Sequence, residues 1–263
     1  MIKKIKKYFE YVETILYKNL NEKKKFIHNQ KISYLFEKNR ESDRLIVVFS
    51  ACTREGVPAR YNYVRTLKER KENKIFILDN LGEDRRGSYY LGKFPKFEFE
   101  KAVKELLDQV ISENNIKSVI FCGSSKGGYA AINFGIMYND SVGEGIIIGA
   151  PQFWLGEYLS APANRVTLEG ICDGNNKNKV VSNLNERLKN KIDRDDCYRK
   201  QKIYIHYSIE EHTYKEHIQD LCKQLRENGY ELIENVESYK EHSEVSLYFP
   251  KYLKELICKI WND

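Results

Sequence analysis

The 263-residue chain contains no apolar stretch near the length of about 20 residues that a transmembrane helix requires. Near its start, Glu10, Glu13 and Lys18 interrupt any run that could form the core of a secretory signal peptide. We also find no internal repeat, low-complexity segment or interdomain linker. Because 41% of the residues are hydrophobic and 31% are charged, the composition is typical of a globular protein. We expect one domain spanning 1–263, located in the cytoplasm.

Closely spaced cysteine pairs are missing as well. The six cysteines are scattered without a Cys-x-x-Cys motif, at Cys52, Cys122, Cys172, Cys197, Cys222 and Cys258. In a chain without a secretion signal, this pattern indicates reduced and mostly buried thiols. We therefore expect neither a disulfide framework nor a metal site.

Positive charge is in excess, with a net charge of +6, and lysines gather in IKKIKK (2–7) and KKK (23–25). Apolar residues at three- and four-residue steps up to Leu20 predict a basic amphipathic helix within 1–24. The lysines fit a solvated helix face, or attraction to a phosphate-bearing glycan, a nucleotide-containing cofactor or a membrane surface. We expect no nucleic-acid partner, because no nucleic-acid-binding module is present and acidic residues are interleaved with the basic ones.

Beyond residue 25, apolar runs that predict buried strands alternate with segments that predict helices. FIHNQKISYLF (26–36) predicts an edge hairpin with a turn at Asn29-Gln30. Further strands are predicted at 45–50, 74–79, 118–123, 145–150, 202–208 and 231–239, and helices at 61–70, 97–114, 127–138, 213–228 and 244–260. The polar segment 151–200 breaks the alternation and predicts a small insertion of helices and loops, or lid. The pattern predicts a mainly parallel sheet covered on both faces, with the active site at the carboxyl ends of its strands.

The segment between strand 118–123 and the next helix, GSSKGG (123–128), matches G-x-S-x-G centred on Ser125. In this strand–turn–helix context the motif is typical of the nucleophile elbow of the α/β-hydrolase fold. The serine occupies a strained turn, and glycines two residues to either side avoid collisions with backbone. A phosphate-binding P-loop is excluded, because Lys126 is followed by glycine and not by Ser or Thr. Ser125 is therefore the predicted nucleophile.

In this fold the catalytic residues follow the chain order serine, acid, histidine. His242 comes after the last predicted strand and directly before the last helix, which is the usual position of the general base. The other histidines fit less well: His28 precedes the sheet, His206 lies within a strand and His217 lies within a helix. His212 lies in the loop where the acid is expected. We therefore predict His242 as the base.

The loop after strand 202–208 offers two acids, Glu210 and Glu211, and the residues alone barely separate them. The acid would hold the imidazole in the correct tautomer and stabilise the imidazolium. For the oxyanion hole we expect one backbone N–H from Lys126 and one from Ala51 or Cys52. Cys52 is also a candidate reactive thiol, although a small residue in a tight loop is the simpler interpretation.

Five segments occur in a shared order with a known family. They are FSAC (49–52), YNYV (61–64), GEDRRGSYYLG (82–92), GSSKGGYAA (123–131) and GAPQFWLGEYL (149–159). Together they resemble bacterial capsule polysaccharide O-acetyltransferases of the α/β-hydrolase fold, which are related to capsular polysaccharide biosynthesis and accessory-secretion acetyltransferase proteins. The resemblance is specific, because the Arg-Gly-Ser-Tyr-Tyr and Ala-Pro-Gln blocks are not general features of hydrolases.

The resemblance implies transfer of an acetyl group from acetyl-CoA to a hydroxyl of a polysaccharide through an acetyl-serine intermediate. Acetyl-CoA would be the donor substrate, with no permanently bound cofactor. At the matching positions Ser125 is the nucleophile and His242 the base. The acid falls on Glu211, where the family has Asp-Asp and this chain has Glu210-Glu211.

Four further residues within these blocks are candidates for binding substrate or cofactor, and the two arginines among them could attract the CoA phosphates or an anionic glycan. The four are Arg85, Arg86, Tyr89 and Gln152. The two arginines fit structural salt bridges equally well. The resemblance is also compatible with peripheral association with capsule machinery at the membrane.

Two alternatives to the acetyltransferase remain open at this point. A serine esterase or deacetylase would use the same triad with water in place of the sugar hydroxyl. A glycan-binding or assembly component could retain the fold without catalysis. The sequence leaves open the acceptor sugar, the hydroxyl modified, the acyl group and the oligomeric state.

Overall fold

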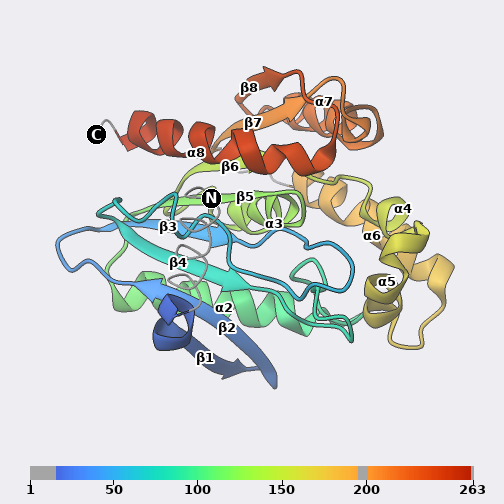
Figure 1. Ribbon diagram of the computed structural model, residues 1–263, viewed down its shortest axis with the longest axis horizontal. Coiled ribbons are helices and arrows are strands. Elements are labelled where there is room, and N and C mark those ends of the chain that lie inside the picture. Colours follow the sequence, from blue (N-terminus) through green and yellow to red (C-terminus); the bar gives the residue numbers. More distant parts are fainter. Residues whose placement is uncertain (1–15, 195–200, 262–263) are drawn as a thin grey trace, which may run out of the picture.

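The computed structural model describes residues 16–194 and 201–261 (Figure 1). Its strands are β1 (Glu22–Ile27), β2 (Gln30–Glu37), β3 (Arg44–Phe49), β4 (Asn73–Leu78), β5 (Ser118–Ser124), β6 (Gly143–Gly149), β7 (Lys202–Ser208) and β8 (Leu232–Glu237). Within the described residues they form one eight-stranded sheet in the order β1-β2-β4-β3-β5-β6-β7-β8. The β1–β2 and β2–β4 pairs are antiparallel, and every pair from β4 to β8 is parallel. The predicted mainly parallel sheet is confirmed.

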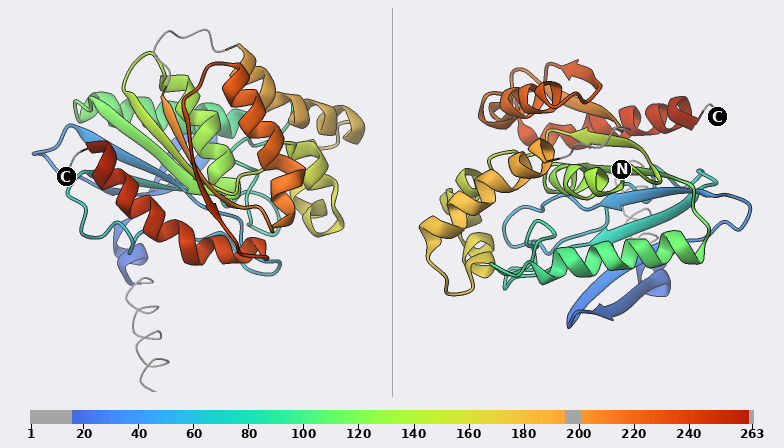
Figure 2. Two further views of the ribbon diagram at one scale, coloured as in Figure 1. Left: turned by 90° about the horizontal axis from the view of Figure 1, so that it is seen from above. Right: turned by 180° about the vertical axis from the view of Figure 1, so that it is seen from behind.

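Helices cover both faces of this sheet. On one face lie α2 (Glu98–Glu113), α3 (Lys126–Gly135) with the short turn η1 (Ile136–Tyr138), and η3 (Tyr214–Ile218) with α7 (Gln219–Glu227). On the other face lies α8 (Val245–Trp261), which follows the turn η4 (His242–Glu244) (Figure 2). Side chains of β4 alternate between the two cores, with Ile75 and Ile77 on the α2 side and Phe76 on the α8 side. Burial on both faces explains why the parallel strands are continuous apolar runs.

The helix predicted at 61–70 is absent, and these residues form turns. Tyr63 has a φ of 61°, which interrupts a right-handed helix. The Nζ atom of Lys74 donates to the carbonyl oxygens of Leu67 and Arg70 at 3.1 and 2.8 Å. A side chain from β4 therefore satisfies carbonyl groups at the end of this segment.

The insertion predicted at 151–200 consists of helices joined by loops where the structure describes it. It contains α4 (Leu155–Ser160), η2 (Pro162–Asn164), α5 (Arg165–Cys172) and α6 (Lys177–Asp193), while residues 195–200 lie outside the described residues. These helices lie together at one end of the molecule (Figure 1). The long helix α6 is polar overall, but four apolar residues at four-residue steps are buried: Val180, Leu184, Leu188 and Ile192. One narrow apolar stripe is enough to hold the helix against the fold.

The amino-terminal region differs from the sequence prediction in two details. The hairpin turn lies at His28-Asn29, one residue earlier than predicted, and both residues have positive φ. The KKK cluster (23–25) lies in β1 and not on a helix. Residues 16–21 are helical, and the rest of the predicted helix before them lies outside the described residues.

Five described cysteines are free thiols, and Cys197 lies outside the described residues. No helix in the described part of the chain has both the length and the apolar character needed to span a bilayer.

Candidate active site

Ser125 lies at the sharp turn between β5 and α3. Its backbone has φ 51° and ψ −122°, a strained conformation for a residue with a side chain. A Cβ atom at Gly123 would collide with the carbonyl of Gly127, and one at Gly127 would collide with the carbonyl of Phe49. Both obstacles are backbone atoms that cannot move aside, so the turn requires glycine at these two positions. The structure thus builds the predicted elbow, with Ser125 at the carboxyl end of a central strand.

Ser125, His242 and Glu211 form a continuous chain of hydrogen bonds. The Nε2 atom of His242 lies 2.9 Å from the Oγ atom of Ser125, and its Nδ1 atom contacts Oε1 of Glu211. A carboxylate at Nδ1 holds the proton on that nitrogen, which leaves Nε2 to accept the proton of Ser125. These three side chains come from the loops after β5, β7 and β8, which meet at one edge of the sheet.

Glu211 is buried, with 2% of its surface exposed. Its Oε1 atom also accepts a hydrogen bond of 2.6 Å from Thr213, a contact that the sequence analysis missed. Burial acts to raise the pKa of the Glu211 carboxyl, but the His242 and Thr213 hydrogen bonds outweigh it and hold the pKa below its ordinary value. Glu211 is therefore ionised at neutral pH, as the acid of such a triad must be.

Glu210, the second candidate acid, does not reach His242. Its side chain is exposed, and its backbone N–H donates to Ser208 Oγ at 3.1 Å. Of the two adjacent glutamates, the structure thus brings only Glu211 to the histidine.

The two glutamates make a matched pair for mutagenesis. We expect Glu211→Gln to lower kcat for an activated ester roughly 10³- to 10⁴-fold, because an amide no longer fixes the imidazole tautomer or stabilises the imidazolium. Glu210→Gln should leave kcat unchanged. Steady-state ester turnover by the two purified variants measures both effects. A larger loss in the Glu210 variant would assign the acid to that residue.

The predicted oxyanion hole needs one correction. The backbone N–H of Ala51 donates to Oδ1 of Asn62 at 2.9 Å, so it is not free to bind a substrate oxygen. Within the described residues, no acceptor is found for the N–H of Cys52. The N–H of Lys126 lies in the first turn of α3, where a helix has no partner for its N–H groups. Cys52 and Lys126 therefore remain the candidate donors.

Arg86, predicted to contact substrate or to form structural contacts, does the latter. Its guanidinium is buried and donates to the carbonyl of Thr53 at 2.9 Å and to the carbonyl of Ala163 at 3.2 Å. It also lies 3.4 Å from Sγ of Cys52. Arg86 thus ties the loop after β3 to the helical insertion. Arg85 is exposed and remains a candidate binding residue.

Tyr89 and Gln152, the other two candidate binding residues, are fully buried beside the nucleophile. Both side chains are linked by hydrogen bonds to each other and, through Gln152, to Ser125. They therefore belong to the wall of the reaction centre and not to an outer binding surface.

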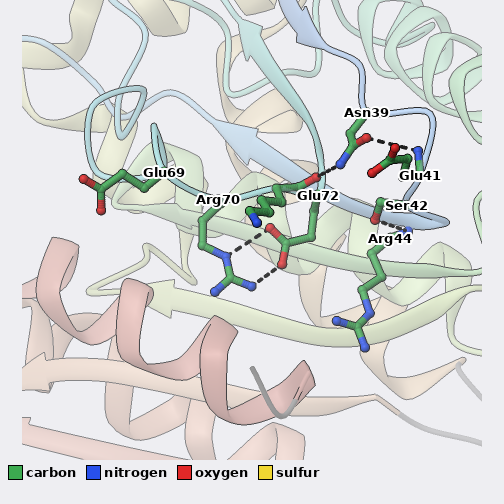
Figure 3. Close-up of a pocket in the computed structure, with 8 residues that line it drawn as sticks. Asn39, Glu41, Ser42, Arg44, Glu69, Arg70 and Glu72 are labelled. Atoms are coloured by element: carbon green, nitrogen blue, oxygen red, sulfur yellow. Dashed lines mark hydrogen bonds and ion pairs between the residues drawn. The ribbon is translucent and has the colours of Figure 1, made fainter.

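A separate hollow of about 500 Å³ lies at the opposite edge of the sheet (Figure 3). It is lined by residues of the β2–β3 loop and of the segment before β4, including Asn39, Arg70 and Glu72. Arg70 and Glu72 form an ion pair, and Asn39 bonds the backbone of Lys71. Because this hollow lies at the amino ends of β3 and β4, it is remote from Ser125 and we assign it no role in catalysis.

Comparison with known proteins places this chain in a family. A search of curated proteins found no match. Among solved structures, the capsule O-acetyltransferase of Neisseria meningitidis serogroup A is similar with a TM-score of 0.74 and 22% identity, over 91% of this chain and 98% of that chain. The glycosylation associate protein (Gap123) complex from Streptococcus agalactiae gives a TM-score of 0.70 and 20% identity, over 91% of this chain and 47% of that chain.

A third solved structure is FphF, a fluorophosphonate-binding serine hydrolase of Staphylococcus aureus, with a TM-score of 0.61 and 15% identity over 89% of this chain and 93% of that chain. At these identities the similarities show a shared α/β-hydrolase fold. Residues 69–232, more than half of the chain, match the family described as serine aminopeptidase, S33. The chain therefore belongs to the serine aminopeptidase S33 family of serine hydrolases.

Proposed function

We propose that this protein is an O-acetyltransferase that moves an acetyl group from acetyl-CoA to a hydroxyl of a cell-surface polysaccharide, through an acetyl-serine on Ser125. The observation that carries the proposal is the hydrogen-bonded chain of Ser125, His242 and Glu211 at the elbow. The fold similarity to a capsule O-acetyltransferase supports a glycan acceptor. A mutant of that protein has been solved in complex with CoA, which supports a CoA thioester as donor.

In the first half-reaction, Nε2 of His242 accepts the hydroxyl proton of Ser125 as Oγ attacks the thioester carbonyl carbon. The N–H groups of Lys126 and Cys52 donate to the oxyanion that forms. The C–S bond then breaks, and the CoA sulfur takes the proton from His242. Glu211 stays ionised throughout and stabilises the imidazolium.

In the second half-reaction, a sugar hydroxyl takes the place of CoA. His242 accepts its proton while the hydroxyl oxygen attacks the acetyl carbon of acetyl-Ser125. The bond from this carbon to Oγ breaks, and the proton on His242 returns to Oγ. The same donors stabilise both oxyanions, so one site performs both steps.

The helical insertion α4–α6 is the proposed lid over this site, since Arg86 links it to the loop after β3. Its neighbour Arg85 is exposed, and we assign it to the CoA phosphates or to an anionic glycan. A dry acceptor site under such a lid would favour the sugar hydroxyl over water. Because acetyl-CoA is made and used in the cytoplasm, we place the reaction there.

Mass spectrometry of protein incubated with acetyl-CoA tests the proposal. We expect an acetyl adduct on the peptide that contains Ser125, and transfer of this acetyl group when acceptor polysaccharide is added. Acetate release at the same rate with and without acceptor would instead identify an esterase or deacetylase. If a fluorophosphonate probe fails to label Ser125 in the folded protein, the result would instead support a non-catalytic glycan-binding component.

A further inference from the structure

The side chain of Gln152 contacts the reacting oxygen of Ser125. Gln152 follows β6, has 0% of its surface exposed, and places Nε2 3.2 Å from Oγ. Its Oε1 atom is farther from Oγ, at 3.4 Å, and receives a hydrogen bond of 3.3 Å from the hydroxyl of Tyr89. A buried carboxamide in direct contact with a nucleophile is not required by the triad itself.

The direction of this hydrogen bond follows from the protons available. Ser125 has one hydroxyl proton, and His242 Nε2, at 2.9 Å, is the acceptor for it. Oγ can therefore only accept from Gln152. The Tyr89 hydroxyl donates to Oε1 at 3.3 Å. Burial raises the pKa of Tyr89 well above its ordinary value, so this donor stays protonated. With its oxygen occupied by Tyr89, the carboxamide turns its N–H toward Ser125.

We propose that Gln152 is a catalytic residue that donates a hydrogen bond to Ser125 Oγ while this oxygen carries negative charge. The proposal rests on the acyl-serine route above. Charge develops on Oγ twice: when its proton moves to His242 during attack, and when the bond to the acetyl carbon breaks and its electron pair returns to Oγ. Gln152 gives up no proton in either step. A hydrogen bond to a charged oxygen is roughly twice as strong as one to a neutral oxygen, so the contact favours both transition states over their ground states.

The surroundings hold the carboxamide in this orientation. Tyr89, which bonds Oε1, is itself fully buried, and its ring packs edge-on against Tyr129 and Tyr158 at centroid distances of 5.7 and 6.1 Å. A donor fixed before the reaction needs no reorganisation when charge appears. Tyr89 is thus a positioning residue that acts through Gln152.

The main test compares Gln152→Met with Gln201→Met. Methionine keeps the length of the side chain but has no donor. Gln201 is a matched control, because it is also buried and its Nε2 bonds the backbone of Gly135, away from the catalytic edge. Stopped-flow with p-nitrophenyl acetate gives the rate constant for acylation of Ser125, and hydroxylamine then gives the rate constant for removal of the acetyl group. We expect Gln152→Met to lower both about 10- to 100-fold without raising KM, and Gln201→Met to change neither.

Two further variants separate a catalytic role from a structural one. Tyr89→Phe keeps the ring and releases the carboxamide, so it should lower the same two rate constants by a smaller factor even if Gln152→Met folds poorly. In Gln152→Glu, a carboxylate opposes charge on Oγ, whereas a protonated carboxyl can donate. The acylation rate of this variant relative to the wild type should therefore rise as the pH falls.

Several results would overturn the proposal. One is a Gln152→Met variant in which only KM changes. Another is an equal loss of both rate constants in the Gln152→Met and Gln201→Met variants. A third is an acylation rate of Gln152→Glu, relative to the wild type, that does not depend on pH. Because p-nitrophenyl acetate acylates an activated serine whatever its natural donor, the test is separate from the proposed function. Wild-type protein that reacts with this ester but not with acetyl-CoA would reject acetyl-CoA as donor and still allow Gln152 to be judged. If the ester leaves Ser125 unmodified, the role of Gln152 is rejected as well.

Discussion

Ser125→Ala is expected to abolish acyl transfer, with a loss in kcat on the order of 10⁴- to 10⁶-fold, because the variant lacks the oxygen that forms the acyl intermediate. Alanine, like serine, has a Cβ atom, so the strained turn at φ 51° should form as before. Thiol release from acetyl-CoA measures turnover, and circular dichroism shows whether the fold is kept. Residual activity within tenfold of the wild type would move the nucleophile to another residue.

The neighbouring serine is the matched control for this variant. Ser124 is buried at the end of β5, and its Oγ lies 2.5 Å from the hydroxyl of Tyr63; within the described residues no hydrogen bond joins it to His242. We expect Ser124→Ala to retain turnover and to lose about 1–2 kcal/mol of stability, because the partly buried hydroxyl of Tyr63 loses its partner. Loss of activity in both variants would indicate that the turn itself is disturbed.

That Ser125 and His242 lie at the same edge of the sheet could be predicted from the G-x-S-x-G motif, the chain order of the fold and the hydrophobic pattern of the strands. Continuous apolar runs marked the parallel strands, and parallel strands place their carboxyl ends at one edge. Ser125 follows β5 and His242 follows β8, so both lie at that edge. The pattern could not choose between Glu210 and Glu211, since the choice depends on which side chain turns inward to Thr213 and His242.

Several contacts that the sequence analysis missed are hydrogen bonds between a side chain and the backbone of another segment. Asn62 accepts a hydrogen bond from the N–H of Ala51. Arg86 donates to the carbonyls of Thr53 and Ala163. Lys74 donates to two carbonyls of the 61–70 segment. Because nearly every residue has a backbone N–H and a carbonyl, the sequence does not indicate which of them a given side chain will bond. Such contacts become visible only when the chain is folded.

The sequence analysis considered only the backbone N–H of Lys126 and missed the role of its side chain. Its side chain is fully buried, and Nζ donates to the carbonyls of Asp79 and Arg86 at 3.0 and 2.6 Å. Nζ also lies 3.5 Å from Oδ2 of Asp79. This Oδ2 atom in turn accepts the N–H groups of Ser88 and Tyr90 at 2.7 and 2.9 Å. The ion pair therefore joins the nucleophile elbow to the loop that carries Tyr89.

Breaking this ion pair should be the most damaging change to stability among those considered. We expect Lys126→Met to lower the free energy of unfolding by about 3–5 kcal/mol, since Asp79 is left charged and buried without its cation. Urea unfolding followed by circular dichroism measures the loss. Asp79→Asn keeps an oxygen that can accept from Ser88 and Tyr90, so the double variant should lose less than the sum of the two single variants.

Activity should fall along with stability in the Lys126→Met variant. Residues 79–90 would lose their link to the first turn of α3, and the N–H of Lys126, a candidate oxyanion donor, would no longer be held in place. A placement error of about 1 Å at a reacting centre can reduce a rate roughly 100-fold. If stability drops but kcat measured well below the unfolding transition is unchanged, the ion pair supports the fold alone. A loss below about 1 kcal/mol would show instead that Asp79 finds other donors once Lys126 is removed.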